Sequence, residues 1–343
     1  MASNSSTGGA GTRVVSPPAL AAVVTVVLWA SAFVGIRGLG EQFSPGSMAF
    51  WRLLSAVVPL TALMLIIRRR ERARTDAGAR PWFPRRRALG SVIAYGVAWF
   101  AGYTVVLNWA EQHLDAGTAA LLVNLAPILV AVAAGLFLGE GFPRHLIVGV
   151  VIAFAGVVLI ATGGSAGAGA HADRLGVVLG ITAAVLYAGG VLIQKSALRS
   201  VDVLTATWLG ALAGLVATLP FAPVALSEMI DATPGAIAAV IYLGVGPTAV
   251  AFSTWAYALA RTDAGAMAAT TLIVPALVIV MSWALLGELP TGLGIVGGLL
   301  CISGVAIARQ VLPRPRRASV AVKAPRDGLD EPGSASLSGP RVT

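Results

Sequence analysis

Long apolar segments separated by short polar stretches run through most of the chain. A helix needs about 20 apolar residues to cross the hydrocarbon core of a bilayer. Backbone groups inside a bilayer must be satisfied within their own segment, so each such segment is expected to be a helix. The pattern predicts an all-α integral membrane protein with ten transmembrane helices. The predicted spans are 18–37, 45–67, 88–110, 115–138, 144–163, 174–195, 202–222, 234–257, 263–286 and 290–309.

Composition agrees with this pattern and excludes a soluble protein. Hydrophobic residues make up 57% of the 343 residues and charged residues 11%, whereas a soluble domain has about 25% charged residues. The apolar run at 19–36 is longer than the core of a cleaved signal peptide, and we interpret it as the first span. The single cysteine, Cys301, lies in an apolar run, so no disulfide framework is expected within one chain.

The basic residues predict how the chain crosses the membrane. The loop 68–87 and the tail from Arg309 are both rich in arginine. If ten spans alternate, all but three of the 24 basic residues fall on one side, the exceptions being Arg37, Arg52 and Arg174. Cytoplasmic loops carry such an excess, so both termini are predicted to be cytoplasmic, in a multi-pass protein of the cell membrane. The net charge of +9 is then an orientation signal, and no nucleic acid partner is expected.

The sequence contains an internal repeat. Residues 114–140 align without a gap with residues 262–288, at a separation of 148 residues. Asp115 matches Asp263, and Pro127 matches Pro275. Two halves of five helices each enter the membrane from opposite faces, so the repeats are predicted to be inverted. Inverted repeats recur in transporters, with the substrate site near the midplane between the halves.

The composition shifts along the chain divide it into five predicted parts. The ends are polar and resemble disordered segments, and the short Gly/Ala-rich linker separates the two repeats. The parts are a disordered cytoplasmic N-terminus at 1–17, a first repeat at 18–163, an extracytoplasmic linker at 164–173, a second repeat at 174–310 and a disordered cytoplasmic tail at 311–343.

Three motifs resemble those of a known family. Leu28-Trp29-Ala30-Ser31-Ala32-Phe33 resembles a W-x-S-x-F opening, and Ala49-Phe50-Trp51-Arg52-Leu53-Leu54 resembles an F-x-R-x-L start of the second helix. The repeated A-G…P…L-G-E stretches complete the likeness to the EamA family of the drug/metabolite transporter superfamily. This resemblance implies a ten-helix, two-repeat permease whose members mostly export metabolites such as amino acids. The second half departs from the pattern at Tyr187-Ala188-Gly189 and has no counterpart of Arg52.

Arg52 is the first candidate on a substrate pathway. A charge inside a membrane helix is costly and often functional. Its guanidinium could contact a substrate carboxylate or act as a gate. The alternatives are that it reaches toward the interface, or that it forms a structural pair with Glu111 or Asp115.

Other candidates come from polar and aromatic positions inside the spans. Proline removes a backbone donor, so helix breaks that line a cavity are one interpretation of the polar positions upstream of Pro127 and Pro275. The alternatives are interhelical hydrogen bonding and a plain kink. The predicted pathway residues are Trp29, Ser31, Arg52, Tyr103, Asn124, Tyr187, Trp255 and Thr271. For the aromatic ones, ordinary packing is the alternative.

Three charged residues at helix ends are predicted to be gating or structural groups. Arg37 is expected to extend toward the interface. Glu140 and Glu288 are expected to cap their helices or to pair with a neighbouring loop. Because the acidic residues gather at helix ends, the sequence leaves open facilitated export and coupling through an acid at a helix end.

The predicted function is export of small metabolites, such as amino acids, by alternating access. The alternatives are a lipid flippase on the same fold and a membrane scaffold that transports nothing. An enzyme is not expected, because no two reactive groups share one depth. No phosphate-binding loop or metal spacing is present in the sequence, so neither a cofactor nor a metal is expected. The expected partners are a small-molecule substrate and the lipid bilayer, and a homodimer is left open.

Overall fold

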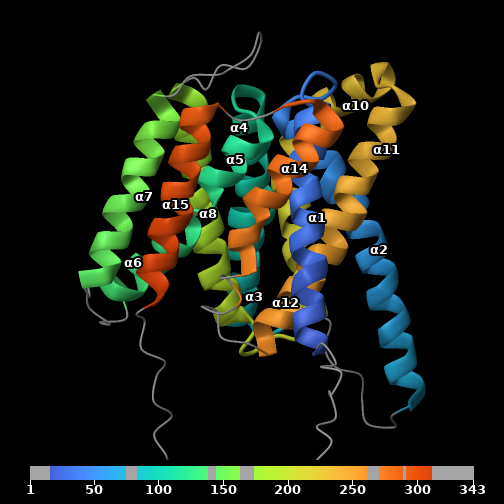
Figure 1. Cartoon of the computed structure of the whole chain (residues 1–343). Helices are drawn as coiled ribbons and strands as arrows, with labels where there is room; N and C mark the ends of the chain where they lie inside the picture. The colour runs from blue at the N-terminus through green and yellow to red at the C-terminus, as the bar shows by residue number, and fades with distance from the viewer. Residues whose placement is uncertain are drawn as a thin grey trace, which may run out of the picture. The chain divides into compact units, whose positions relative to one another are not determined.

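A computed structural model describes residues 16–74, 83–137, 144–162, 174–261, 267, 270–288 and 291–310. All of them belong to one compact unit, Met1–Val311 (Figure 1). The described residues form helices and no strand, as the apolar pattern predicts. The first half contains α1 (Pro17–Leu39), α2 (Pro45–Arg74), α3 (Arg86–Tyr95), η1 (Gly96–Tyr103), α4 (Thr104–His113), α5 (Ala116–Val123), α6 (Ala126–Phe137) and α7 (Arg144–Thr162).

The second half repeats this series with additional short turns. It contains α8 (Arg174–Ala197), α9 (Val203–Thr218), η2 (Leu219–Phe221), α10 (Ala222–Asp231), α11 (Pro234–Leu243), η3 (Gly244–Val250), α12 (Ala251–Arg261), η4 (Thr271–Ile273), α14 (Val274–Leu286) and α15 (Gly292–Gln310). The helices of the two halves pack on one another, α1 against α12 and α14, α2 against α9, and α4 against α8. The core between the halves is therefore shared by both.

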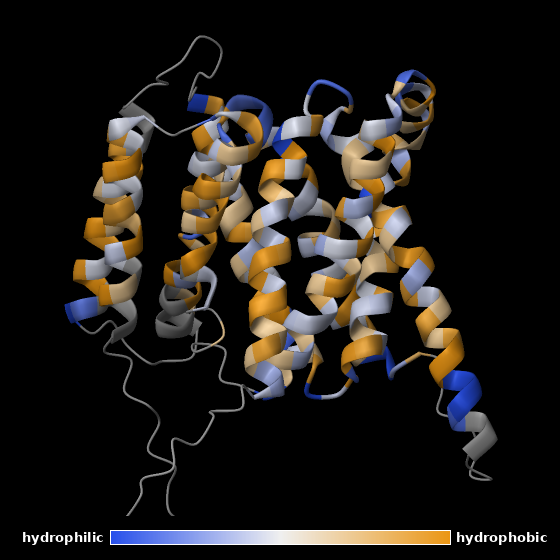
Figure 2. Ribbon diagram, turned by 45° about the vertical axis from the view of Figure 1, so that its right-hand side comes forward, coloured by the Kyte–Doolittle hydropathy of each residue, from blue (hydrophilic) through white to orange (hydrophobic). Residues whose placement is uncertain are grey.

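Six helices of the described residues are long and apolar enough to cross a membrane, and four shorter ones are apolar. Figure 2 shows apolar residues along the helices and polar residues gathered at their ends. Apolar side chains also face outward: Phe154 on α7 is 67% exposed. The long spans are Pro17–Leu39, Pro45–Glu71, Arg86–His113, Arg174–Ala197, Val203–Asp231 and Pro234–Arg261, and the shorter helices are Ala116–Val130, Ile147–Leu159, Val274–Leu286 and Gly292–Gly304.

The structure differs from the predicted spans in three places. The predicted helix 115–138 is broken at Asn124 and Leu125, between α5 and α6. Pro127 has no N–H to donate to the carbonyl of Val123. The carbonyl of Ala120 accepts from both the backbone N–H and the side chain of Asn124, each at 3.1 Å. In addition, α2 continues to Arg74 through the first part of the basic cluster, and α10 was not predicted.

The two halves share local geometry that the aligned segment did not reveal. The π-helical segments η1 and η3 begin at Gly96 and Gly244, which are 148 residues apart. A Cβ atom at Gly96 would collide with the backbone of Gly210 on α9, and one at Gly244 would collide with the backbone of Arg52 on α2. Glycine at both positions allows the helices to approach closely. Positions 52 and 210 are therefore structural counterparts.

Candidate functional site

A small cavity lies where the two halves meet. Its volume, measured as the space open to the centre of a water molecule, is about 30 Å³, enough for about one or two waters. Both halves contribute side chains, mostly apolar ones. The lining residues are Trp29, Ala32, Phe33, Arg52, Trp99, Tyr103, Leu107, Val123, Asn124, Pro127, Tyr187, Phe252, Thr271 and Val274.

Aromatic rings form one wall of the cavity. Trp29 of α1 is at its centre, with its ring centroid 6.2 Å from Trp99, 6.0 Å from Tyr187 and 5.4 Å from Phe252. All three pairs meet edge to face, an arrangement that aromatic quadrupoles favour. Trp255 packs against Trp29 at 4.9 Å but does not line the cavity. The rings thus come from helices of both halves.

Several polar atoms near this wall are buried without a hydrogen-bond partner among the described residues. They are Nε1 of Trp29 and Trp99, Nη1 of Arg52 and Oδ1 of Asn124. An unpaired buried polar group is costly, so their retention needs a reason. Together these atoms offer a ligand three donors and one acceptor, and one of the donors carries a full positive charge.

Arg52 is fixed from the second half of the chain. Its side chain is 4% exposed, and its Nε donates to Oγ1 of Thr248 in η3 at 2.7 Å. Thr248 in turn donates to the carbonyl of Leu243 at 2.9 Å, five residues earlier. Neither expected partner bonds to Arg52: Asp115 accepts from Thr118 at the start of α5, and the carboxylate of Glu111 has no hydrogen-bond partner among the described residues.

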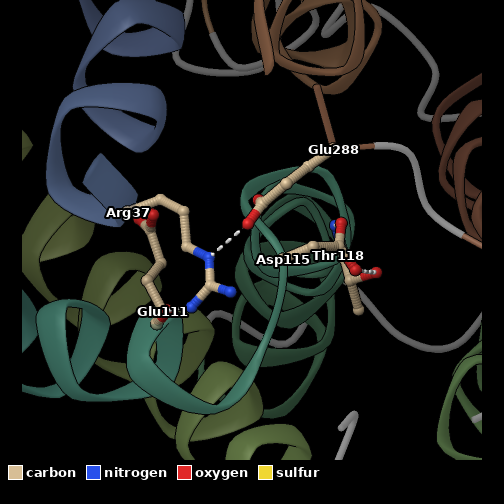
Figure 3. A network of polar contacts seen from close by, with 5 residues as sticks. All are labelled: Arg37, Glu111, Asp115, Thr118 and Glu288. Atoms are coloured by element: carbon tan, nitrogen blue, oxygen red, sulfur yellow. Dashed lines mark hydrogen bonds and ion pairs between the residues drawn. The ribbon is translucent and has the colours of Figure 1, made fainter. Parts of the chain in front are cut away.

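A group of charged residues lies at the end of α1 (Figure 3). Nε of Arg37 forms an ion pair with Oε1 of Glu288 at 2.9 Å, and Nη1 of Arg37 donates to the carbonyl of Glu111 at 2.9 Å. Arg37 therefore binds within the protein, although we predicted that it would extend to the interface. Glu288 pairs with a helix of the other half, although we predicted capping or a neighbouring loop. The ion pair joins α1 to the end of α14.

The structure brings together six of the eight predicted pathway residues around the cavity: Trp29, Arg52, Tyr103, Asn124, Tyr187 and Thr271. Trp255 packs against Trp29 outside the cavity lining. Ser31 lies elsewhere, because its Oγ is 2.6 Å from the hydroxyl of Tyr242 and donates to the carbonyl of Leu28. Glu140 is outside the described residues.

Three residues of the site, Trp99, Phe252 and Thr248, were not predicted from the sequence. Trp99 lies in the middle of a predicted span rather than at an interface, and tryptophan away from the interface was a usable signal. Thr248 gave no signal, because its role depends on the π-helical turn of η3, which places its hydroxyl against Arg52.

These features define an all-helical membrane protein whose two related halves enclose a central cavity. Residues 16–162 and 174–310 each match the EamA-like transporter family, and the chain belongs to this family. It is therefore a multi-pass membrane transporter for a small-molecule substrate.

Several named relatives and one solved structure agree with this family assignment. The chain is 35% identical to a "Probable terminal-alkyne amino-acid exporter" of Streptantibioticus cattleyicolor, over 87% of this chain and 96% of the relative. It is 29% identical to an uncharacterised transporter of Bacillus subtilis, over 81% and 86%. It is 23% identical to a "Probable amino-acid metabolite efflux pump" of Escherichia coli, over 83% and 92%. A solved crystal structure of a protein has the same fold, with a TM-score of 0.56 at 20% identity, covering 89% of this chain and 100% of that one.

Proposed function

We propose that this transporter exports small amino acids and related carboxylates by alternating access, with the substrate carboxylate bound by Arg52. The observation that carries this proposal is Arg52, a residue that lines a cavity shared by both halves and whose buried Nη1 has no partner among the described residues. Guanidinium binds carboxylates through charge-assisted hydrogen bonds. Two of the named relatives are amino-acid or amino-acid-metabolite exporters, which supports the same substrate class.

The other cavity groups suit the rest of an amino acid. Oδ1 of Asn124 can accept a hydrogen bond from an ammonium group. The faces of Trp29, Trp99 and Tyr187 can attract the same cation. The apolar residues between them favour a small aliphatic side chain, so we take L-valine as the test substrate.

The proposed topology is ten spans in two inverted halves, with both termini in the cytoplasm. The six long and four shorter apolar helices support ten membrane spans. The distribution of the basic residues supports the cytoplasmic location of both termini. In this topology the Arg37–Glu288 ion pair lies at the outer end. Glu111, whose carbonyl accepts from Arg37, then lies at this end, and Arg52 lines the cavity.

The cavity is too small for an amino acid, so transport requires movement. We propose that the outer end opens when the Arg37–Glu288 ion pair separates, because this pair joins the two halves there. Arg37→Gln should therefore expose the cavity to the outside more often. The side chains of Arg37 and Glu288 are 21% and 26% exposed. A partly exposed ion pair of this kind contributes up to about 1 kcal/mol. Its loss would shift the ratio of outward-open to closed protein by at most about fivefold.

This shift is measured by the rate at which a cysteine introduced at Ala32 reacts with a thiol reagent. We expect an outside thiol reagent to modify Ala32→Cys up to about fivefold faster in the Arg37→Gln background. The exchanged pair Arg37→Glu with Glu288→Arg should return the rate toward that of the parent. Equal rates in all three backgrounds would remove the ion pair from the gating mechanism.

The proposed function is tested by changing the substrate and not the protein. Proteoliposomes containing the protein are loaded with unlabelled compounds, and the entry of labelled L-valine by exchange is measured. Internal L-valine should drive exchange, and its methyl ester, which has no carboxylate, should drive at least about tenfold less. Equal exchange with both would disprove a carboxylate contact. No exchange with either would shift weight to the flippase and scaffold alternatives.

A further inference from the structure

Glu111 is a buried acidic group that the proposed function does not use. It lies in the last turn of α4 and is 1% exposed. Neither of its carboxylate oxygens has a hydrogen-bond partner among the residues that the structure describes. A charged carboxylate in such a position is costly unless it is paired. No hydrogen bond among the described residues therefore explains why the chain keeps a carboxylate at position 111.

Charged groups approach Glu111 from several helices. Arg37 of α1 and Arg52 of α2 act on it as positive charges, and Glu288 and Asp115 act on it as negative charges. Both arginines also have other partners. Arg37 is bound to Glu288 and to the backbone carbonyl of Glu111, as Figure 3 shows for the first of these contacts.

The remaining neighbours of α4 add little charge at this end. Nε of Arg52 is bound to Thr248, and Tyr103 of η1 interacts with Arg52 from the cavity side. The adjoining helix α8 contributes Arg174, which is exposed at its first residue. Asp115 is occupied in capping α5 through Thr118. Arg52 and Glu111 are thus charges of opposite sign that are not hydrogen-bonded to each other.

The second half of the chain provides an internal control. The alignment at a separation of 148 residues continues from Asp115 back to Glu111, which matches Leu259. The carbonyl of Glu111 accepts from Arg37 at 2.9 Å, and the carbonyl of Leu259 accepts from Lys195 at 2.7 Å. The backbone contact is kept while the side chain changes. The fold therefore does not require a carboxylate at this position.

The same comparison applies to Arg52, whose structural counterpart is Gly210. Both buried charges are thus present in the first half only. With the site empty, Arg37 is paired with Glu288, and we take Glu111 to be ionised, with Arg52 as its compensating positive charge. A ligand that brings one net negative charge to Arg52 leaves the charge of Glu111 uncompensated in a low-dielectric region. One proton taken from water by a carboxylate oxygen of Glu111 restores neutrality.

We propose that Glu111 is a proton-binding site linked to Arg52, so that an anionic ligand bound at Arg52 brings one proton to Glu111. The proposal rests on the proposed carboxylate contact. A zwitterionic amino acid brings its own positive charge and needs no proton. A carboxylate without an ammonium group crosses together with a proton as an electroneutral pair. Glu111 lies outside the cavity lining, so it acts through the charge of Arg52 and does not touch the ligand.

Two probes test this linkage, L-valine and N-acetyl-L-valine, which has the carboxylate but no ammonium group. Each is added to the purified protein in lipid nanodiscs in weak buffer. Bound ligand and proton uptake are measured together. We expect about one proton per bound N-acetyl-L-valine and close to none per L-valine. Glu111→Gln should bind both probes with no proton uptake.

The pH dependence gives a second readout. Uptake of one proton means that the affinity of the parent for N-acetyl-L-valine falls as the pH rises, by up to about tenfold per pH unit. For Glu111→Gln, which imitates the neutral carboxyl, the affinity should stay constant. If that variant does not fold, Glu111→Leu, which carries the residue of the second half, replaces it.

The outcomes separate the two proposals. If both probes bind and the parent takes up no proton, or if the variant takes up as many as the parent, the linkage is wrong and the carboxylate contact stands. If neither probe binds, the carboxylate contact fails, and the linkage fails with it.

Discussion

Arg52→Ala is expected to weaken binding of L-valine about 10- to 100-fold and to reduce export from overproducing cells accordingly. A hydrogen bond to a charged group contributes about 1.5–3 kcal/mol, and each 1.4 kcal/mol is tenfold in affinity. Arg52→Lys keeps the charge but loses the planar arrangement of donors, so its export should fall between those of the parent and of Arg52→Ala. Export is measured at matched amounts of protein in the membrane.

The control addresses the structural contact of Arg52. Its Nε donates to Thr248, so Arg52→Ala removes a bond between the halves as well as the proposed substrate contact. Thr248→Val removes the acceptor and leaves the guanidinium in place. If Thr248→Val loses as much export as Arg52→Ala, the effect comes from the contact between the halves and not from the substrate. Near-parental export with Thr248→Val assigns the loss to the cavity.

Gly244→Ala is expected to destabilise the protein by about 1–3 kcal/mol, the usual range for overpacking a close contact. The added Cβ would lie 2.5 Å from Cβ of Ser55 and would also collide with the carbonyl oxygen of Arg52. Backbone cannot move aside as a flexible side chain can, so α2 and η3 must separate. The measurement is the free energy of unfolding in mixed detergent micelles.

Gly189→Ala is the matched control for that substitution. Gly189 is also a helical glycine, but a Cβ there would meet no atom within 4 Å. Alanine favours a helix over glycine by about 1 kcal/mol, so this variant should be as stable as the parent or slightly more stable. Similar losses in both variants would show that the close approach of η3 to α2 is unimportant for stability.

Much of the fold could be predicted because a bilayer limits the choices. An apolar segment of about 20 residues has to be a helix, and the aligned prolines identified the two halves. The long spans that begin at Pro17 and Pro45 were predicted within a few residues at their starts. Helix α10 was missed because the predicted span ended at 222, in a stretch that contains Pro220 and Pro223, whereas the chain there starts a new helix at Ala222. The break at Asn124 was predictable from Pro127.

The candidate site was predictable in composition but not in geometry. A buried arginine and aromatic residues inside spans indicated the cavity residues, and their roles in transport remain predictions. Periodicity could not show that Trp99 faces the cavity, because η1 is π-helical and changes the direction in which its side chains point. The burial of Glu111 was not predicted, because its position near a helix end suggested contact with water. Tertiary packing decides both cases, that of η1 against α8 and α9 and that of α4 against α1, α2 and α8.

The matching π-helical segments have a consequence for the history of the chain. A π-helical turn closes its hydrogen bond over one more residue than an α-helical turn, so inserting one residue into an α-helix can produce it. Here the two segments begin 148 residues apart, at Gly96 and Gly244, in the third long helix of each half. Two separate insertions at equivalent positions require more events than one insertion before the gene duplicated. On the account that needs fewer events, the ancestral five-helix protein already carried this distortion before its gene was duplicated.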